Sequence, residues 1–201
     1  MITIIDYGMG NLRSVQKAFE KIGVPAMISS NPNDVMRADK IVLPGVGAFS
    51  ACMENLTKFG LVEPIREVIR NKKPFLGICM GLQVLFEEGE EFGAHAGMGI
   101  LPGKVIRFRL PKKYKIPHMG WNRIRKKTKS ALFNDIDENS NFYFVHSYHV
   151  VPKDPKIIST VTDYGKDFVS SIVQDNLFAC QFHPEKSQTL GLKVLKTFAT
   201  L

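Results

Sequence analysis

The chain has 201 residues, of which 44% are hydrophobic and 23% charged, and its formal net charge is +8. This length and composition allow one substantial core, so a single domain spanning residues 1–201 is expected. No apolar run reaches the ~18 residues of a membrane span, no signal peptide is recognisable, and the three cysteines form no Cys-x-x-Cys pair. These features argue against a membrane protein, a disulfide framework and a structural zinc site, and they predict a cytoplasmic protein with reduced thiols.

The first half of the chain alternates strand and helix patterns. Short apolar runs predict strands, and apolar residues at helical spacing predict amphipathic helices between them. The predicted strands are 2–6, 26–29, 41–43 and a run ending at Cys79, and the predicted helices are 12–22, 51–59, 62–70 and 80–88. This alternation indicates a mostly parallel sheet with right-handed crossovers.

The second half consists mainly of short β patterns separated by turn residues, which favours antiparallel pairing. The predicted strands are 104–108, 121–125, 142–146, 148–151, 157–162, 168–173 and 177–182, and residues 188–199 predict a last helix. The fold class that follows is α/β: a three-layer domain with a central, mostly parallel sheet and added antiparallel strands in the second half.

Cys79 ends the apolar run that begins at Pro74, and Gly77 and Gly81 stand two residues before and after it. A strand that ends at Cys79 and a helix that begins at Met80 would place the thiol on a sharp turn, which is the nucleophile-elbow arrangement in a cysteine form. A helix N-terminus also favours the thiolate. The pattern predicts that Cys79 is a nucleophile, whereas Cys52 and Cys180 are expected to be buried core residues.

A base and a carboxylate stand two positions apart after the last predicted strand, at His183 and Glu185. Pro184 favours extended backbone at His183, so the two side chains can point towards one site. A thiol, an imidazole and a carboxylate are the set that cysteine-based acyl transfer requires. The sequence therefore predicts a triad of Cys79, His183 and Glu185.

Acyl transfer also needs backbone N–H groups aimed at the developing oxyanion. The turn after strand 41–43 is flanked by glycines, so the peptides at Val46 and Gly47 can orient freely, and the N–H of Met80 directly follows the nucleophile. These three residues are the predicted oxyanion hole.

The sequence predicts no metal site and no cofactor. His146 and His149 are three apart on predicted strand, so they are expected on opposite faces, and His95 and His118 lie in loop-like stretches. The glycines at Gly8 and Gly10 match only the start of a dinucleotide-binding fingerprint.

Taken together, these motifs resemble those of the triad (class I) glutamine amidotransferases, and more narrowly those of the glutaminase subunits of imidazole glycerol phosphate synthases. The resemblance extends from the first strand to the last helix. It is carried by the segments 6–11, 43–47, 77–83, 117–122, 142–148 and 181–187. In the family's commoner elbow, Leu and Met stand in the opposite order to Met80 and Leu82, an exchange that roughly conserves volume and keeps the backbone N–H.

The resemblance implies that Cys79 attacks the side-chain amide of L-glutamine, forms a glutamyl thioester and releases ammonia. Water then hydrolyses the thioester to glutamate. The resemblance further implies that the glutamine is held by Gln83 and by the backbone near Gly47, Ser147 and Tyr148.

The resemblance also implies a partner, a separate (β/α)8 cyclase subunit that forms a heterodimer with this chain. The cyclase uses the ammonia on a phosphoribulosyl-formimino ribonucleotide in histidine biosynthesis and makes imidazole glycerol phosphate and aminoimidazole carboxamide ribonucleotide. The resemblance further implies that Asn11, Trp121 and Lys186 lie near the interface with this partner. Such a chain is expected to be slow alone and to be activated by the ligand-loaded cyclase.

Several alternatives remain open from the sequence. A paralogous glutaminase subunit that supplies ammonia to another acceptor, such as a surface-polysaccharide sugar, would need the same motifs. A catalytically inactive binding module is disfavoured by the complete triad, and a cysteine peptidase is disfavoured by Gln83. Residues 104–129 hold eleven Lys or Arg and no Asp or Glu. This stretch fits a solvated face or a partner-docking surface better than nucleic-acid binding, because Pro111, Pro117 and Gly120 interrupt it.

Overall fold

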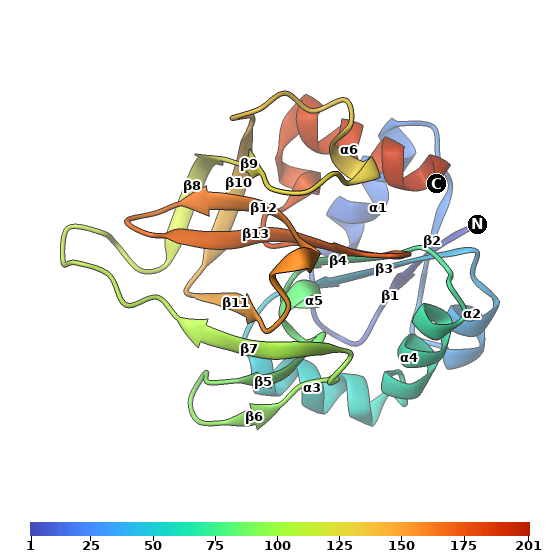
Figure 1. Ribbon diagram of the computed structural model, residues 1–201. Coiled ribbons are helices and arrows are strands. Elements are labelled where there is room, and N and C mark those ends of the chain that lie inside the picture. Colours follow the sequence, from blue (N-terminus) through green and yellow to red (C-terminus); the bar gives the residue numbers. More distant parts are fainter.

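The computed structural model describes residues 1–201 and is built around an eight-stranded sheet (Figure 1). In spatial order its strands are β2 (Ala26–Ser29), β1 (Ile2–Ile5), β3 (Lys40–Gly45), β4 (Phe75–Cys79), β14 (Leu177–Cys180), β13 (Asp167–Gln174), β12 (Ile158–Asp163) and β9 (Arg125–Lys126). The first five pair in parallel, and the last three add to the edge in antiparallel pairing. The predicted fold class is confirmed.

Helices cover both faces of this sheet, which gives the three predicted layers (Figure 1). Helices α1 (Leu12–Lys21) and α6 (Gln188–Thr200) lie on one face, and α2 (Pro32–Arg37), α3 (Phe49–Lys58) and α4 (Val62–Arg70) lie on the other. Successive side chains of a strand point to opposite faces of the sheet. Ile4 accordingly packs in the core under α1 and α6, and Ile5 packs in the core under α3 and α4. No helix is long and apolar enough to span a bilayer.

Two smaller sheets come from the middle of the chain. One contains β11 (Tyr148–Pro152), β7 (Leu101–Arg107), β5 (Phe86–Gly89) and β6 (His95–Ala96) in that spatial order. The other is a two-stranded antiparallel ribbon of β8 (His118–Arg123) and β10 (Asn141–His146). The 3-10 helices η1 (Ala131–Phe133), η2 (Pro155–Ile157) and η3 (Pro184–Lys186) complete the fold.

Most predicted elements lie within about three residues of the observed ones, but one predicted helix is too long and some observed elements were not predicted. The helix predicted over 80–88 ends at Gln83 as α5 (Met80–Gln83), and the following residues enter β5. Helix α2 was not predicted, although Asn31 caps it by accepting from the N–H of Asn33 at 2.9 Å and Pro32 occupies its first turn.

Three neighbouring parallel strands place the functional motifs at one edge of the sheet. Gly45 at the end of β3 pairs with Cys79 at the end of β4, and β14 runs beside β4 with Cys180 paired to Ile78. The segments that leave these carboxyl ends are the turn at residues 46–47, the elbow at Cys79 and the segment containing His183. The carboxyl ends of parallel strands are where open α/β sheets bind ligands.

Candidate active site

Cys79 sits on a strained turn between β4 and α5. Its φ of 55° and ψ of −104° lie in the left-handed half of conformational space, which non-glycine residues rarely adopt. Such a conformation costs about 1–3 kcal/mol and persists only when the surroundings enforce it. The predicted nucleophile elbow is therefore present in the backbone.

The two glycines of the elbow are required by close backbone approach. A Cβ on Gly81 would lie 1.9 Å from the carbonyl oxygen of Leu43, and a Cβ on Gly77 would lie 2.6 Å from the carbonyl oxygen of Gly81. Without side chains at these positions, α5 packs directly against β3 and β4. The glycines therefore hold Cys79 at its position and leave its sulfur facing the pocket.

His183 and Glu185 follow β14, and their side chains are joined. His183 Nδ1 lies 2.8 Å from Glu185 Oε1, and both side chains are only 2% exposed. Because the carboxylate accepts, Nδ1 carries the proton. Nε2 of His183 has no hydrogen-bond partner, and His183 lines the same pocket as Cys79.

The backbone of His183 is held from both sides. Its N–H donates to the carbonyl oxygen of Tyr143 on β10 at 2.9 Å. The hydroxyl of Ser187 donates to the carbonyl oxygen of His183 at 2.6 Å and accepts from the N–H of Tyr143 at 3.0 Å. These bonds tie the histidine to the β8/β10 ribbon.

The electrostatics of the site favour the protonated form of His183. Burial by itself lowers the pKa of His183, but the nearby Cys79 sulfur and then Glu185 outweigh it and raise that pKa to about 10. A protonated imidazolium next to a cysteine is the arrangement found around reactive cysteines. Burial instead raises the pKa of Cys52 to about 11 and raises that of Cys180, so both of these thiols stay protonated, in line with their expected core positions.

The pocket at Cys79 has a volume of about 250 Å³. All the residues predicted for the oxyanion hole and for glutamine binding lie in its wall. The sequence did not predict four further wall residues, among which Glu91 is the only carboxylate. The complete lining is Val46, Gly47, Cys79, Met80, Gln83, Glu91, Pro117, Val145, His146, Ser147, Tyr148 and His183.

Two buried glutamines are hydrogen-bonded to each other at this pocket, Gln83 in its wall and Gln181 next to Cys79. Gln83 Nε2 donates to the carbonyl oxygen of Tyr148 at 3.2 Å and to Oε1 of Gln181 at 3.0 Å. Gln181 Nε2 in turn donates to Cys79 Sγ at 3.6 Å. Sequence reasoning assigned no role to Gln181, although it stands two residues before His183.

Two of the three residues expected at a partner interface, Trp121 and Lys186, lie against the same ring, and the third, Asn11, lies on a neighbouring element. Trp121, 48% exposed, meets the ring of Tyr143 edge-on at 6.0 Å, and Lys186 Nζ lies 6.0 Å from the same ring centroid. Asn11 is exposed at the start of α1, which packs against η3. Met119, 66% exposed, continues this surface along β8.

The basic stretch is distributed over several elements. Lys104 pairs with Glu88 and Arg125 with Asp167. Other cations of the stretch lie on the loop between β7 and β8, which extends from the body of the molecule (Figure 1). Tyr114 of this loop packs against Tyr164 with the ring centroids 5.2 Å apart.

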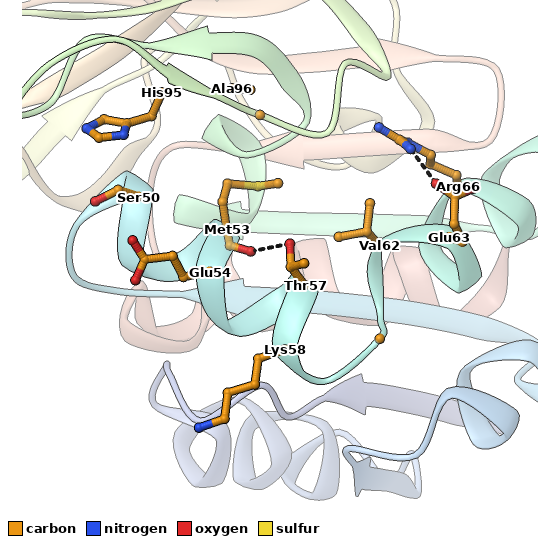
Figure 2. A pocket seen from close by; sticks show the side chains of 12 residues that line it. Ser50, Met53, Glu54, Thr57, Lys58, Val62, Glu63, Arg66, His95 and Ala96 are labelled. Atoms are coloured by element: carbon orange, nitrogen blue, oxygen red, sulfur yellow. Dashed lines mark hydrogen bonds and ion pairs between the residues drawn. The ribbon is translucent and has the colours of Figure 1, made fainter.

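A larger groove of about 880 Å³ lies between α3, α4 and the β6 segment (Figure 2). Within it Arg66 pairs with Glu63, and the hydroxyl of Thr57 donates to the carbonyl oxygen of Met53 at 2.8 Å. None of its lining residues belongs to the Cys79 pocket. No three His, Cys, Asp or Glu side chains gather anywhere as a metal-binding group.

Comparison with known proteins identifies the family of the chain. The model of the family "Glutamine amidotransferase class-I" matches residues 3–200. "Imidazole glycerol phosphate synthase subunit HisH" of Syntrophotalea carbinolica is 52% identical over 206 residues, with all of both chains covered. The protein of the same name from Aquifex aeolicus is 55% identical, covering 97% of this chain and 94% of its own.

Solved structures share the fold at low sequence identity. "Structure of PurLQS from Thermotoga maritima" superposes with a TM-score of 0.77 at 17% identity, covering 99% of this chain and 97% of that one. "Crystal structure of glutamine amidotransferase" gives a TM-score of 0.73 at 15% identity with both chains fully covered. Because the family model matches nearly the whole length of this chain, the chain belongs to the class-I glutamine amidotransferase family.

Proposed function

We propose that this chain, as a single domain in the cytoplasm, is the glutaminase subunit of an imidazole glycerol phosphate synthase. The observation that carries the proposal is the meeting of Cys79 with the His183–Glu185 pair in one small pocket. Identity of about 50% over the full length to subunits of that synthase supports the biological reaction.

The reaction begins with the Cys79 thiolate, which attacks the side-chain amide carbon of L-glutamine. The oxyanion that forms is stabilised by backbone N–H groups of Val46, Gly47 and Met80, all in the wall of the pocket. His183 gives its Nε2 proton to the amide nitrogen, so the C–N bond breaks, ammonia leaves and a glutamyl thioester remains.

Hydrolysis of the thioester restores the enzyme. His183, now neutral, takes a proton from water as the water attacks the thioester carbon. The tetrahedral intermediate expels the Cys79 thiolate and releases glutamate. Glu185 keeps the proton of the imidazole on Nδ1 throughout, so that Nε2 is the atom that exchanges protons with the substrate.

The pocket contains groups suited to the polar end of glutamine. Both N–H bonds of Gln83 are used within the protein, which leaves its Oε1 as an acceptor. Glu91, whose Oε2 accepts from the N–H of Phe49 at 2.8 Å, brings a negative charge for the α-ammonium group. Ser147 and Tyr148 also line the pocket, and their backbone is available to the substrate.

The proposed partner is a (β/α)8 cyclase subunit that receives the ammonia and forms a heterodimer with this chain. We assign its docking surface to Trp121, Lys186 and Asn11, because an exposed indole beside a cation is typical of interface anchors. Trp121→Ala should weaken the complex by tenfold or more, and the dissociation constant measured by titration calorimetry checks this. An unchanged dissociation constant would show that Trp121 is not part of the interface.

The function is tested by glutamate release from the purified chain, measured with and without the cyclase and its nucleotide ligand. Turnover should be slow for the chain alone, should rise steeply in the loaded complex, and should vanish in Cys79→Ala. Full activity of the chain alone would refute the proposed activation by the cyclase. Absence of turnover in the loaded complex would remove the glutaminase assignment.

A paralogue that feeds another acceptor, such as a surface-polysaccharide sugar, is not favoured, because the relatives compared above carry the imidazole glycerol phosphate synthase name. Complementation of a histidine auxotroph that lacks its own glutaminase subunit separates the two. Growth supports the histidine pathway, and failure with soluble protein present supports the paralogue.

A further inference from the structure

A cluster of three buried histidines adjoins the pocket, with His146 in its wall, and takes no part in the steps above. His118 and His146 face each other across the β8/β10 ribbon, and His149 lies on β11. All three pack around the ring of Phe108, with centroid distances of 6.4, 5.1 and 4.8 Å. The sequence-based expectations of a loop position for His118 and of opposite faces for His146 and His149 are therefore wrong, because His118 is buried in β8 and the other two rings pack on one phenyl ring.

The bonds of His146 and His118 fix which nitrogen carries each proton. His146 Nδ1 lies 2.8 Å from the carbonyl oxygen of Tyr148, which can only accept, so Nδ1 carries the proton and Nε2 accepts. His118 Nδ1 lies 3.0 Å from that Nε2 and must therefore donate to it. His118 Nε2 is left as an acceptor.

Asn122 supplies the donor that this acceptor needs. Its Nδ2 lies 3.2 Å from His118 Nε2 and donates to the carbonyl oxygen of Asp163 at 2.8 Å. Its Oδ1 accepts from the N–H of Arg123 at 2.8 Å, which fixes the orientation of the amide. Both histidines are thereby held neutral, in agreement with burial, which lowers the pKa of His118 to about 4 and that of His146 to about 3.

The hydrogen bonds from Asn122 through His118 to His146 form a relay. This relay ends on the backbone carbonyl of Tyr148, which also holds the side chain of Gln83. The Tyr148 oxygen accepts from His146 on one side and from Gln83 on the other, and Gln83 continues through Gln181 to the Cys79 sulfur. Every donor and acceptor from Asn122 to Cys79 is assigned without conflict. The outer ribbon and the thiol are thus connected by one continuous set of hydrogen bonds.

We propose that Asn122 and His118 are positioning residues for glutamine binding, acting through His146 and the Tyr148 carbonyl to hold Gln83 in its orientation. Neither residue lines the pocket, so neither touches the substrate. This inference rests on the proposed glutaminase function. Loss of the relay frees Gln83 to rotate, which weakens binding of glutamine more than it slows the chemistry at Cys79.

The direct test is the position of the protons. In the full-length chain labelled with 15N-histidine, two-bond 1H–15N correlation spectra at neutral pH should show His118 and His146 neutral with the proton on Nδ1. A proton on Nε2 of either ring, or an imidazolium, overturns the relay. Because this measurement does not use activity, it stands even if the glutaminase assignment fails.

The kinetic test uses His118→Phe with His149→Phe as the matched control, both in complex with the cyclase subunit. His149 is equally buried on the same Phe108 ring, but its only hydrogen bond is to the adjacent carbonyl of Val150. His118→Phe should raise the KM for glutamine about five- to tenfold with kcat within about twofold. His149→Phe should leave both within about twofold.

Two further variants keep the proposal falsifiable if His118→Phe folds poorly. His118→Gln retains one donor and one acceptor and should recover most of the KM. Asn122→Asp, at a half-buried position, replaces the donor by an acceptor, so it should move a proton to His118 Nε2 and raise KM about as much as His118→Phe. An unchanged KM in Asn122→Asp, or equal effects of the two Phe variants, overturns the proposal.

Discussion

The buried histidines make the stability of this protein sensitive to acid. Burial lowers the pKa of His118 and His149 from 6.5 to about 4 and that of His146 to about 3. The unfolded chain takes up a proton on each ring below about pH 6.5, whereas the folded chain does not until much lower pH. The unfolding free energy therefore falls as the pH falls from 6.5 towards 4.

The size of this effect follows from the same pKa values. Each histidine that is protonated only in the unfolded state lowers the unfolding free energy by about 1.4 kcal/mol per pH unit. At about pH 5 each of the three rings has removed roughly 2 kcal/mol, and together they remove about 6 kcal/mol. Folded domains are typically stable by about 5–15 kcal/mol, so acid unfolding is expected near pH 4–5.

Replacing one ring isolates its share of the pH dependence. His149→Phe removes one proton-binding site from the unfolded chain and loses little in the folded state, because His149 Nε2 has no hydrogen-bond partner. Urea unfolding of wild type and variant between about pH 5 and 6 should give a slope of free energy against pH that is smaller by about a third in the variant. Equal slopes would show that His149 titrates alike in both states and would refute the reasoning.

Three further predictions concern the elbow and the triad. Cys79→Ala should abolish glutamate release and labelling by a glutamine-analogue alkylator, and label retained on another cysteine would contradict the assignment. Glu185→Gln should lower kcat by about 10²- to 10⁴-fold and move the alkaline limb of the pH profile down from near pH 10, because Glu185 helps to raise the pKa of His183; steady-state kinetics across pH checks both. Gly81→Ala should lower the unfolding free energy by about 2 kcal/mol or more in urea titrations, since its Cβ would lie 1.9 Å from the Leu43 oxygen, and an unchanged midpoint would mean that the elbow relaxes freely.

Local patterns in the sequence were sufficient for the parallel sheet and the elbow. The run that ends at Cys79 is apolar, and its flanking glycines are explained by contacts under 3 Å that any side chain would make. The helix after the elbow is shorter than its pattern predicted. Residues 84–86 are buried to 0% exposure and Phe86 pairs with β7, so tertiary pairing outweighs the helical spacing there.

Side-chain partners distant in sequence could not be predicted. Gln181 and Cys79 are 102 positions apart, and a glutamine within a predicted apolar strand gives no indication of which atom it will contact. His118 stands beside Pro117 and Gly120, which is typical of a loop, and only its pairing with His146 across the ribbon buries it. Such positions depend on strand register, which is set by the whole fold.

That register also explains how an event on the surface can reach the thiol. Side chains alternate along β8, so Met119 and Trp121 face outwards while His118 and Asn122 face inwards. The proposed docking surface and the proposed relay are thus the two faces of one ribbon. The opposite strand β10 also accepts the N–H of His183 at Tyr143 and lines the pocket at Val145. A partner that tilts this ribbon is therefore expected to displace His183 and the Val145 side of the pocket together, since His183 is hydrogen-bonded to β10 and Val145 belongs to it.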